Sequence, residues 1–352
     1  MKHLHVVVDT QFGSTGKGLL AGYLAKSLCP DTILTAWGPN AGHTFIDTDG
    51  SKYINIAIPN GIVGQDRLKR LMFGPGSIIN PEIMLAEMER YHALVGHLDL
   101  LIHHHACVVT KEHRAAEAQY GFGIGSTMKG VGEAQIQKLQ RRVGPGSNIA
   151  AEALKGTALE GCLVNNEEWD FAIDDTEVAI IEGAQGFSLS LNQGFYPYVT
   201  SRDCTTHQLL SDCALPLAGS DGTSVNSYSM DVYGVARTYP IRVANRFKGG
   251  QMVGTSGPCY FDQEEIQWQE IGLEPELTTV TKLPRRVFTF SDEQIRRAVR
   301  MDGIDHMFLN FANYDQTRNG RSIGDISEAI ARAGAKVRYL GWGPALEDIQ
   351  IL

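Results

Sequence analysis

The sequence predicts an α/β fold in which a single domain, residues 1–352, is built on a mostly parallel central sheet with helices on both faces. Two observations support this prediction. Short apolar runs rich in β-branched residues alternate with amphipathic segments near both ends of the chain, a pattern typical of parallel strands joined by helices. The glycine- and serine-bearing stretches at 144–149 and 218–229 have motif-bearing segments on both sides, so we expect surface loops there and no domain boundary.

The individual elements follow from periodicity. Residues 4–10, LHVVVDT, predict a buried strand, and residues 17–28 predict a helix in which Leu20, Leu24 and Leu28 share one face. A glycine-rich loop separates them, so the chain begins with a strand, a loop and a helix. Further strands are predicted at 31–37, 98–110, 177–184, 306–312 and 336–342, and a further amphipathic helix at 326–335.

Composition excludes several classes of protein. A net charge of -9 argues against a protein that binds nucleic-acid backbones, which usually shows a basic excess on one face. The sequence has no apolar run of the roughly 20 residues that a membrane span needs, and its amino terminus lacks a signal-peptide pattern. We therefore expect a cytoplasmic protein. Six scattered cysteines without a Cys-x-x-Cys pair favour reduced thiols over disulfides or structural zinc.

The loop after the first predicted strand combines glycines with a lysine. Glycines allow backbone N–H groups to approach phosphate oxygens, and a lysine at the start of a helix adds positive charge. The loop is shorter than the usual P-loop pattern and has Gly18 where that pattern places a Ser or Thr. A triphosphate site and an ordinary strand-to-helix turn both suit this spacing. The residues are Gly13, Ser14, Thr15, Gly16, Lys17 and Gly18.

A second loop, Asn40, Ala41, Gly42, His43 and Thr44, follows the next predicted strand. Ligands of α/β proteins bind at this edge of the sheet, where the strands end. A histidine here could act as an acid or as a hydrogen-bond donor. Taken alone, a loop histidine also suits an ordinary surface position.

Six segments together resemble the adenylosuccinate synthetase family. In chain order they are TQFGSTGKG, NAGHT, IPNGI, IGSTMKGVG, EGAQG and YPYVTS. EGAQG followed by YPYVTS is specific, whereas the glycine loop alone is not. The resemblance runs from Val6 to the carboxyl end, and the chain is shorter than typical members. It implies the predicted fold, a homodimer, and a reaction in two steps: a Mg²⁺-bound triphosphate phosphorylates the 6-oxygen of a purine nucleotide, and the amine of aspartate then displaces phosphate.

The resemblance also implies roles for individual residues at the triphosphate. His43 would stabilise charge on the 6-oxygen, so His43 and Ser14 are the candidate catalytic residues. Magnesium would be coordinated by the backbone of Gly42, with a weak contribution from Ser14. The expected triphosphate-binding residues are Gly13, Ser14, Thr15, Gly16, Lys17, Gly18, Gly42, His43, Thr44, Asn310, Gly343 and Pro344.

For the purine nucleotide, the resemblance implies that Asn40, Thr127 and Thr200 bind the 5′-phosphate and that Gln185 lines the base pocket. Ser14, Ala41 and Ser126 complete this set, and either Arg141 or Arg142 would reach the phosphate across the dimer interface. The run TTVTKLPRRV resembles the aspartate loop of the family. It would place Thr281, Arg285 and Arg286 near aspartate, although a solvated basic turn is the alternative.

Three departures from the family suggest a different substrate. Ser14 stands where the family has a proton-accepting aspartate, which makes room for a 2-amino group and offers it an acceptor. Leu283 replaces an arginine that contacts the ribose 2′-hydroxyl, and residues 309–312, LNFA, replace the segment that reads guanine in GTP. These departures point to dGMP as substrate and to ATP or dATP as donor, as in a phage-type branch that makes a 2-aminoadenine precursor. Asp9, where the family usually has glycine, could replace some of the lost negative charge.

Other interpretations stay open. The first alternative is the ordinary reaction of IMP with GTP, and a more remote one is a nucleotide-binding switch protein without enzymatic activity. The run His103, His104 and His105, with His97 and His113 nearby, also suggests a metal site. Alternation along a regular strand would send His104 to the opposite face from the other two, so a structural strand is favoured.

Overall fold

The computed structural model describes residues 1–142, 144, 146–216, 228–278, 282–314, 316, 318 and 320–352. Its main feature is a ten-stranded sheet in which every neighbouring pair is parallel except β18 and β19 at one edge. In spatial order the strands are β19 (Ile349–Ile351), β18 (Lys336–Gly341), β17 (His306–Asn310), β11 (Ser229–Arg237), β1 (His3–Asp9), β10 (Val178–Glu182), β2 (Thr32–Thr35), β5 (Arg70–Phe73), β7 (Asp99–His103) and β9 (Leu163–Val164).

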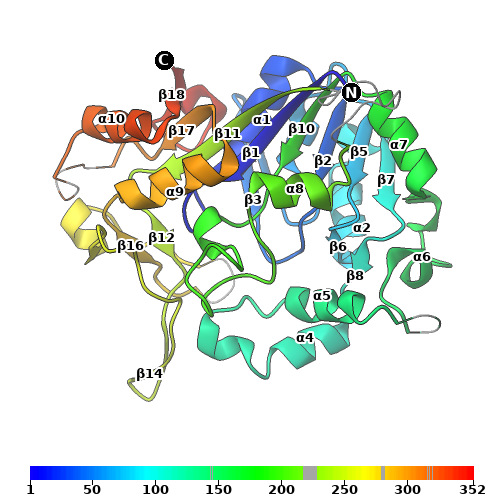
Figure 1. Cartoon of the computed structure of the whole chain (residues 1–352), viewed down its shortest axis with the longest axis horizontal. Coiled ribbons are helices and arrows are strands. Elements are labelled where there is room, and N and C mark those ends of the chain that lie inside the picture. The colour runs from blue at the N-terminus through cyan, green and yellow to red at the C-terminus, as the bar shows by residue number, and fades with distance from the viewer. Residues whose placement is uncertain are drawn as a thin grey trace.

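Helices cover both faces of this sheet (Figure 1). The side chain of Val7 joins a core with α1 on one face, whereas Val6 and Val8 join a core with α7, α9 and α10 on the other. The alternation of side chains along the strands therefore produces two apolar layers. The helices are α1 (Lys17–Leu28), α2 (Pro81–Arg90), α3 (His92–Val95), α4 (Lys111–Glu117), α5 (Val131–Leu139), α6 (Ala150–Ala153), α7 (Asn166–Asp174), α8 (Thr206–Asp212), α9 (Asp292–Asp302) and α10 (Ile323–Ala333).

Smaller sheets accompany the ten-stranded sheet. A three-stranded antiparallel sheet lies beside the carboxyl ends of the main strands, and three two-stranded ladders complete the set. Their strands are β3 (His43–Ile46), β4 (Lys52–Asn55), β6 (Ile78–Ile79), β8 (Cys107–Val108), β12 (Ile241–Arg242), β13 (Arg246–Lys248), β14 (Gln251–Gly254), β15 (Glu265–Ile266) and β16 (Arg286–Phe288).

The predicted fold class is confirmed, as are the strands and helices expected at both ends of the chain. The central strand β11 was not predicted, because Asp231 and Gly234 interrupt its apolar run. Most of the stretch predicted as a loop at 218–229 lies outside the described residues. Within the part of the chain that is described, no helix is both long and apolar enough to cross a membrane.

Candidate active site

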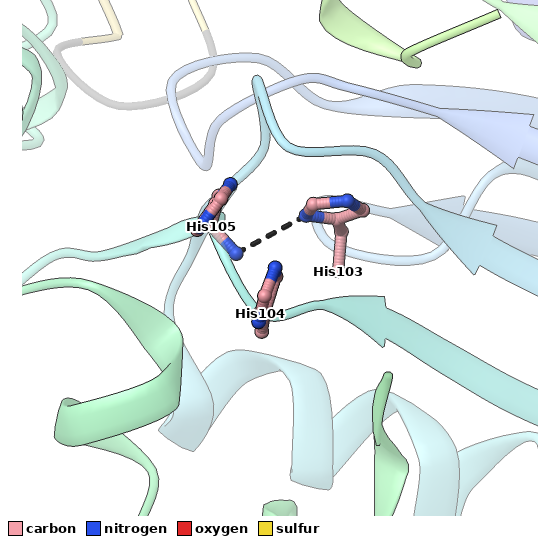
Figure 2. A group of neighbouring side chains, drawn as sticks. All are labelled: His103, His104 and His105. Atoms are coloured by element: carbon pink, nitrogen blue, oxygen red, sulfur yellow. Dashed lines mark hydrogen bonds between the residues drawn. The ribbon is translucent and has the colours of Figure 1, made fainter. Parts of the chain in front are cut away.

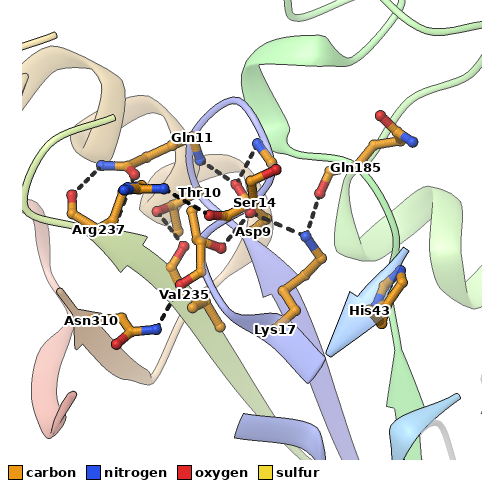
Figure 3. Close-up of polar contacts among 12 residues, drawn as sticks. Asp9, Thr10, Gln11, Ser14, Lys17, His43, Gln185, Val235, Arg237 and Asn310 are labelled. Carbon is orange, nitrogen blue, oxygen red and sulfur yellow. Dashed lines mark hydrogen bonds and ion pairs between the residues drawn. The ribbon is translucent and has the colours of Figure 1, made fainter. Parts of the chain in front are cut away.

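The glycine loop that follows β1 is organised around one buried carboxylate, Asp9 (Figure 3). One oxygen of Asp9 accepts the backbone N–H groups of Gln11 and Gly13, at 2.8 and 3.1 Å. The other accepts the Thr15 hydroxyl and the Lys17 ammonium, the latter at 3.1 Å. Four donors on one buried carboxylate satisfy its charge and fix the path of the loop.

Lys17 begins α1 at the end of this loop, and its ammonium also donates to the carbonyl of Gln185 at 2.7 Å. Gly16, the residue before it, has a φ of 103°, and a Cβ there would lie 2.3 Å from the Asn310 side-chain nitrogen. Asn310 in turn donates to the carbonyl of Thr15 at 3.0 Å. The structure thus brings Asn310, from the end of β17, against the loop.

Ser14 occupies the exposed crest of the loop, with a φ of 54°. Its carbonyl accepts from Arg237 at 3.2 Å, while its hydroxyl has no hydrogen-bond partner among the described residues. Gly18 has a different role, because a Cβ there would lie 2.3 Å from the Asn60 side chain, so this glycine allows α1 to pack closely. Hydrogen bonds therefore fix the conformation of the loop, and the Ser14 hydroxyl is left without a partner among the described residues.

His43 begins β3, and its orientation is set by Glu182 at the end of β10. Its Nδ1 lies 2.7 Å from the Glu182 carboxylate, and the Trp37 ring stacks on the imidazole with centroids 4.1 Å apart. Glu182 is fully buried and also accepts the backbone N–H of Asn60 at 2.8 Å. Since a carboxylate only accepts, Nδ1 carries the proton in this pair and Nε2 is the ring atom left for a ligand.

A pocket lies beside the loop, with about 540 Å³ of space free of protein atoms, part of it open to solvent. It is lined by Asn40, Gln185 and Thr200, three of the residues expected to bind the purine nucleotide. Arg202 also lines it, and this residue was missed although it directly follows the motif YPYVTS. Its guanidinium donates to the carbonyls of Ala36 and Gly76 and pairs with Asp212 at 3.1 Å.

Other expected nucleotide residues lie on the segment that leads into α5 and beyond it. The hydroxyl of Ser126 donates to Glu117 at 3.0 Å, and Thr127 is exposed. Arg141 and Arg142 follow α5, and both are exposed. These four residues do not line the pocket beside the glycine loop.

The remaining expected residues border the same edge of the sheet. Ala41, Gly42 and Thr44 flank His43, and both Gly42 and Thr44 are exposed. Gly343 and Pro344 follow β18, the neighbour of β17.

The two arginines of the expected aspartate loop point to different partners. Arg286 donates through two nitrogens to the carboxylate of Glu265, at 2.8 and 2.6 Å, and also donates to Ser256. Arg285 is partly buried near Glu276, and burial lowers the pKa of its guanidinium while Glu276 opposes this effect. Thr281 lies outside the described residues.

Arg237, at the end of β11, was also missed by the sequence analysis. Its guanidinium lies 3.8 Å from the centre of the Phe311 ring and pairs with Glu276. Burial raises the pKa of the Glu276 carboxyl, but the charge of Arg237 and hydrogen bonds from Arg237 and Tyr314 bring it below its ordinary value. Arg237 thus links Ser14, the end of β17 and the segment before Arg285, and only the unpredicted strand β11 could have revealed it.

The argument that the histidine triplet could not converge is wrong. Strand β7 ends at His103, and His104 and His105 lie in the turn that follows. Ring nitrogens of all three residues therefore come within 4.8 Å of one another (Figure 2). The Nδ1 of His103 accepts the backbone N–H of His105 at 3.1 Å, which keeps this turn tight.

Comparisons with known proteins agree with this arrangement of the motifs. A family model described as adenylosuccinate synthetase matches residues 6–154 and 148–318. The chain is 44% identical to the N6-succino-2-amino-2′-deoxyadenylate synthase of cyanophage S-2L, covering 99% of this chain and 92% of that protein. It is 43% identical to the enzyme of the same name from Vibrio phage phiVC8, covering 100% and 98%.

A solved structure of the cyanophage S-2L succinoaminodeoxyadenylate synthetase, bound to dGMP and to dATP as an energy donor, matches with a TM-score of 0.89. It is 43% identical, and the match covers 100% of this chain and 95% of that one. The family matches along nearly the whole chain, and its motifs meet at one edge of the sheet. The chain therefore belongs to the adenylosuccinate synthetase family.

Proposed function

We propose that the chain joins L-aspartate to carbon 6 of dGMP, using ATP or dATP as phosphoryl donor. The products would be N6-succino-2-amino-2′-deoxyadenylate, the diphosphate of the donor and inorganic phosphate. The names of the phage relatives, and the dGMP and dATP bound in the structure from cyanophage S-2L, support this choice. The observation in this chain that carries it is Ser14, an exposed residue of the glycine loop whose hydroxyl has no hydrogen-bond partner among the described residues.

The purine would lie with its 2-amino group toward Ser14 and its 6-oxygen toward His43. A hydroxyl accepts a hydrogen bond from the 2-amino group and takes up less space than the carboxylate expected from the family. The other side of the nucleotide would be held by Asn40, Gln185 and Thr200, which line the pocket. Binding of this kind selects a 2-aminopurine, because IMP has no amino group to donate to Ser14.

In the first step, the 6-oxygen attacks the γ-phosphorus of the donor, the bond to the β-phosphate oxygen breaks, and the proton of ring nitrogen 1 is lost. Charge that develops on the 6-oxygen would be stabilised by His43 with both ring nitrogens protonated, so that Nδ1–H donates to Glu182 and Nε2–H donates to the 6-oxygen, while the Trp37 ring stacks on the imidazole. A prearranged donor of this kind contributes about 3 kcal/mol to the transition state.

In the second step, the amine of aspartate attacks carbon 6 and loses a proton. The carbon–oxygen bond breaks, and the 6-oxygen leaves as part of inorganic phosphate. The amino acid thereby takes the place of an oxygen that would otherwise be a poor leaving group.

The donor's phosphates would lie along the glycine loop, where Lys17 and the amino end of α1 supply positive charge. The residues present could supply only a minor part of the ligands of a Mg²⁺ ion. The Ser14 hydroxyl and the Gly42 backbone carbonyl are available oxygens, while Asp9 already receives four donors. Bound with the donor, the ion would neutralise charge on the transferred phosphoryl group, and most of its ligands would be phosphate oxygens and water.

Aspartate would bind through Arg285 and Arg286, with Thr281 as a further expected contact. Both arginines already lie near protein carboxylates, so the substrate would compete with Glu276 and Glu265 for them. We also propose a homodimer in which exposed Arg141 or Arg142 reaches the partner's nucleotide phosphate. The enzyme would work in the cytoplasm, where its nucleotide substrates are found.

A panel of substrates tests this function. Phosphate release would be measured with dGMP, GMP, IMP and dIMP, each with aspartate and with ATP, dATP or GTP. We expect the highest kcat/KM for dGMP with ATP or dATP, and no phosphate release without aspartate. A strong preference for IMP with GTP would instead assign the ordinary reaction of the family, and release without aspartate or a purine monophosphate would indicate a simple nucleotide hydrolase.

A further inference from the structure

A cluster of histidines surrounds one carboxylate at the amino ends of three central strands. His3 and His5 lie on β1, Asp231 on the adjacent β11, and His306 begins β17, on the far side of β11. The register pairs His5 with Asp231. His3 lies six residues before Asp9, about 20 Å away at the rise of an extended strand. This cluster is therefore separate from the active site, which lies at the opposite edge of the sheet.

The distances in this cluster suit a coordinated cation. The Asp231 Oδ2 lies 2.8 Å from His3 Nε2 and 3.6 Å from His5 Nδ1, and its Oδ1 lies 3.8 Å from His306 Nε2. Two donors on one tetrahedral zinc ion, each about 2.0–2.1 Å from it, are about 3.3 Å apart. Ligand atoms of His3, His5 and Asp231 all lie within 4.8 Å of one another, so small side-chain rotations bring them onto one ion.

Hydrogen bonding already aligns His3 with Asp231. The hydroxyl of Ser229 lies 2.5 Å from His3 Nδ1 and 3.3 Å from the carbonyl of Lys2, so the shorter contact lets Ser229 donate to Nδ1. His3 Nε2–H then donates to the Asp231 carboxylate at 2.8 Å. A metal ion would take the place of this one proton between the two side chains.

The cluster is accessible and rigidly placed. About a third of the Asp231 side chain is exposed, whereas the His5 side chain is buried. Hydrogen-bonded neighbouring strands hold the backbones of His3, His5 and Asp231, which limits the reorganisation that binding would require.

The histidine triplet of Figure 2 is the weaker metal candidate. One ring nitrogen has a hydrogen-bond partner in each site, His103 Nδ1 in the triplet and His5 Nδ1, 3.2 Å from the Tyr233 hydroxyl, in the other cluster, but the triplet includes no carboxylate to offset the charge of an ion. The triplet also consists of histidines, and its ligand atoms are spaced much like those of the cluster around Asp231. A substitution in the triplet is therefore a matched control.

We propose that His3, His5 and Asp231 bind one divalent cation of the zinc class, with His306 as a neighbour of the carboxylate's second oxygen. Imidazole nitrogens with one carboxylate oxygen select zinc and neighbouring transition metals over magnesium or calcium. The ion would join the amino ends of β1 and β11 and stabilise the fold. It would take no part in the reaction.

Zinc binding to tag-free protein tests this site. Protein freed of metal by a chelator, itself then removed, would be titrated with ZnCl₂ by calorimetry in the presence of MgCl₂. Visible absorption after addition of Co²⁺ would report the geometry around the ion. The variants are His3→Gln, Asp231→Asn and His306→Gln, with His104→Gln as the control from the triplet. Circular dichroism of each metal-free variant would check its fold, and His3→Gln decides the outcome if Asp231→Asn does not fold.

We expect one zinc ion per chain, intense cobalt bands typical of a tetrahedral site, and a higher Tm with zinc. His3→Gln and Asp231→Asn should weaken binding by at least about tenfold, His306→Gln by a smaller factor, and His104→Gln should leave binding unchanged. Two results would overturn the proposal. One is the absence of zinc binding by the unaltered protein, which would make His3 an ordinary hydrogen-bond partner of Asp231. The other is binding that only His104→Gln removes.

Discussion

The glycine loop and the segment around Arg285 and Arg286 both carry charged side chains, but they are prepared for ligands in different ways. In the loop, four donors converge on Asp9, and the hydroxyl of Ser14 has no hydrogen-bond partner in the described part of the chain. In the arginine segment, Arg286 is already paired with Glu265, and Arg285 lies near Glu276. Under the proposed function, the nucleotide would meet a site that is already formed, whereas aspartate would have to displace carboxylates of the protein.

The largest effect is expected from Asp9→Asn, which tests whether the loop depends on its central carboxylate. The change leaves the Lys17 ammonium buried without its charged partner, with the Gln185 carbonyl as its remaining acceptor outside the loop. Breaking a buried ion pair in this way costs about 3–5 kcal/mol. The free energy of unfolding in urea would measure the loss, with Asp99→Asn at an exposed position as control. An unchanged unfolding free energy would show that the loop holds its shape without Asp9.

His43→Ala should lower kcat by about 10²–10³, close to 3–4 kcal/mol, because it removes the proposed donor to the 6-oxygen. Glu182→Gln should have a smaller effect, since the imidazole stays but loses the carboxylate that favours its doubly protonated, donating form. Steady-state kinetics with saturating substrates would measure both. If the two variants had equal activity to the parent, the catalytic assignment of His43 would be wrong.

A buried carboxyl near the pocket predicts how stability depends on pH. Asp302 ends α9 and accepts the backbone N–H of Thr206 at 2.8 Å, and burial raises its pKa to about 7. The folded chain then keeps a proton that the unfolded chain loses near pH 4, so stability falls as pH rises toward 7. The loss between pH 5 and 8 is about 2–3 kcal/mol.

Asp302→Asn should remove this part of the pH dependence, as measured by urea unfolding at pH 5, 6, 7 and 8. A variant whose stability changes with pH as steeply as that of the parent would exclude Asp302 as the cause.

The sequence predicted the two loops that organise the active site, because each follows a short buried strand and its residues are close in sequence. It could not predict the partners of those loops. Glu182 lies 139 residues from His43, and Arg237 lies 223 residues from Ser14, so only the order of strands in the sheet brings them together. The histidine triplet was misjudged because periodicity cannot tell where a strand stops.

Substitutions in the segment around Arg285 and Arg286 should have smaller effects than those in the glycine loop, and they should affect the KM for only one substrate. Arg285→Ala and Arg286→Ala should each raise the KM for aspartate, by about tenfold or roughly 1.4 kcal/mol, and leave the KM for dGMP unchanged. Glu265→Gln should lower the KM for aspartate, because it releases Arg286 from its present partner. Equal changes in the KM for dGMP would indicate that the segment supports the whole site and does not bind aspartate.

The role of Ser14 is tested most directly by the ratio of kcat/KM for dGMP to kcat/KM for IMP, measured in the parent and in Ser14→Asp. The account predicts a high ratio in the parent and a clear fall in the variant, because a carboxylate at the crest of the loop takes the space of the 2-amino group. A parent that prefers IMP, or a variant that loses activity equally on both nucleotides, would contradict it.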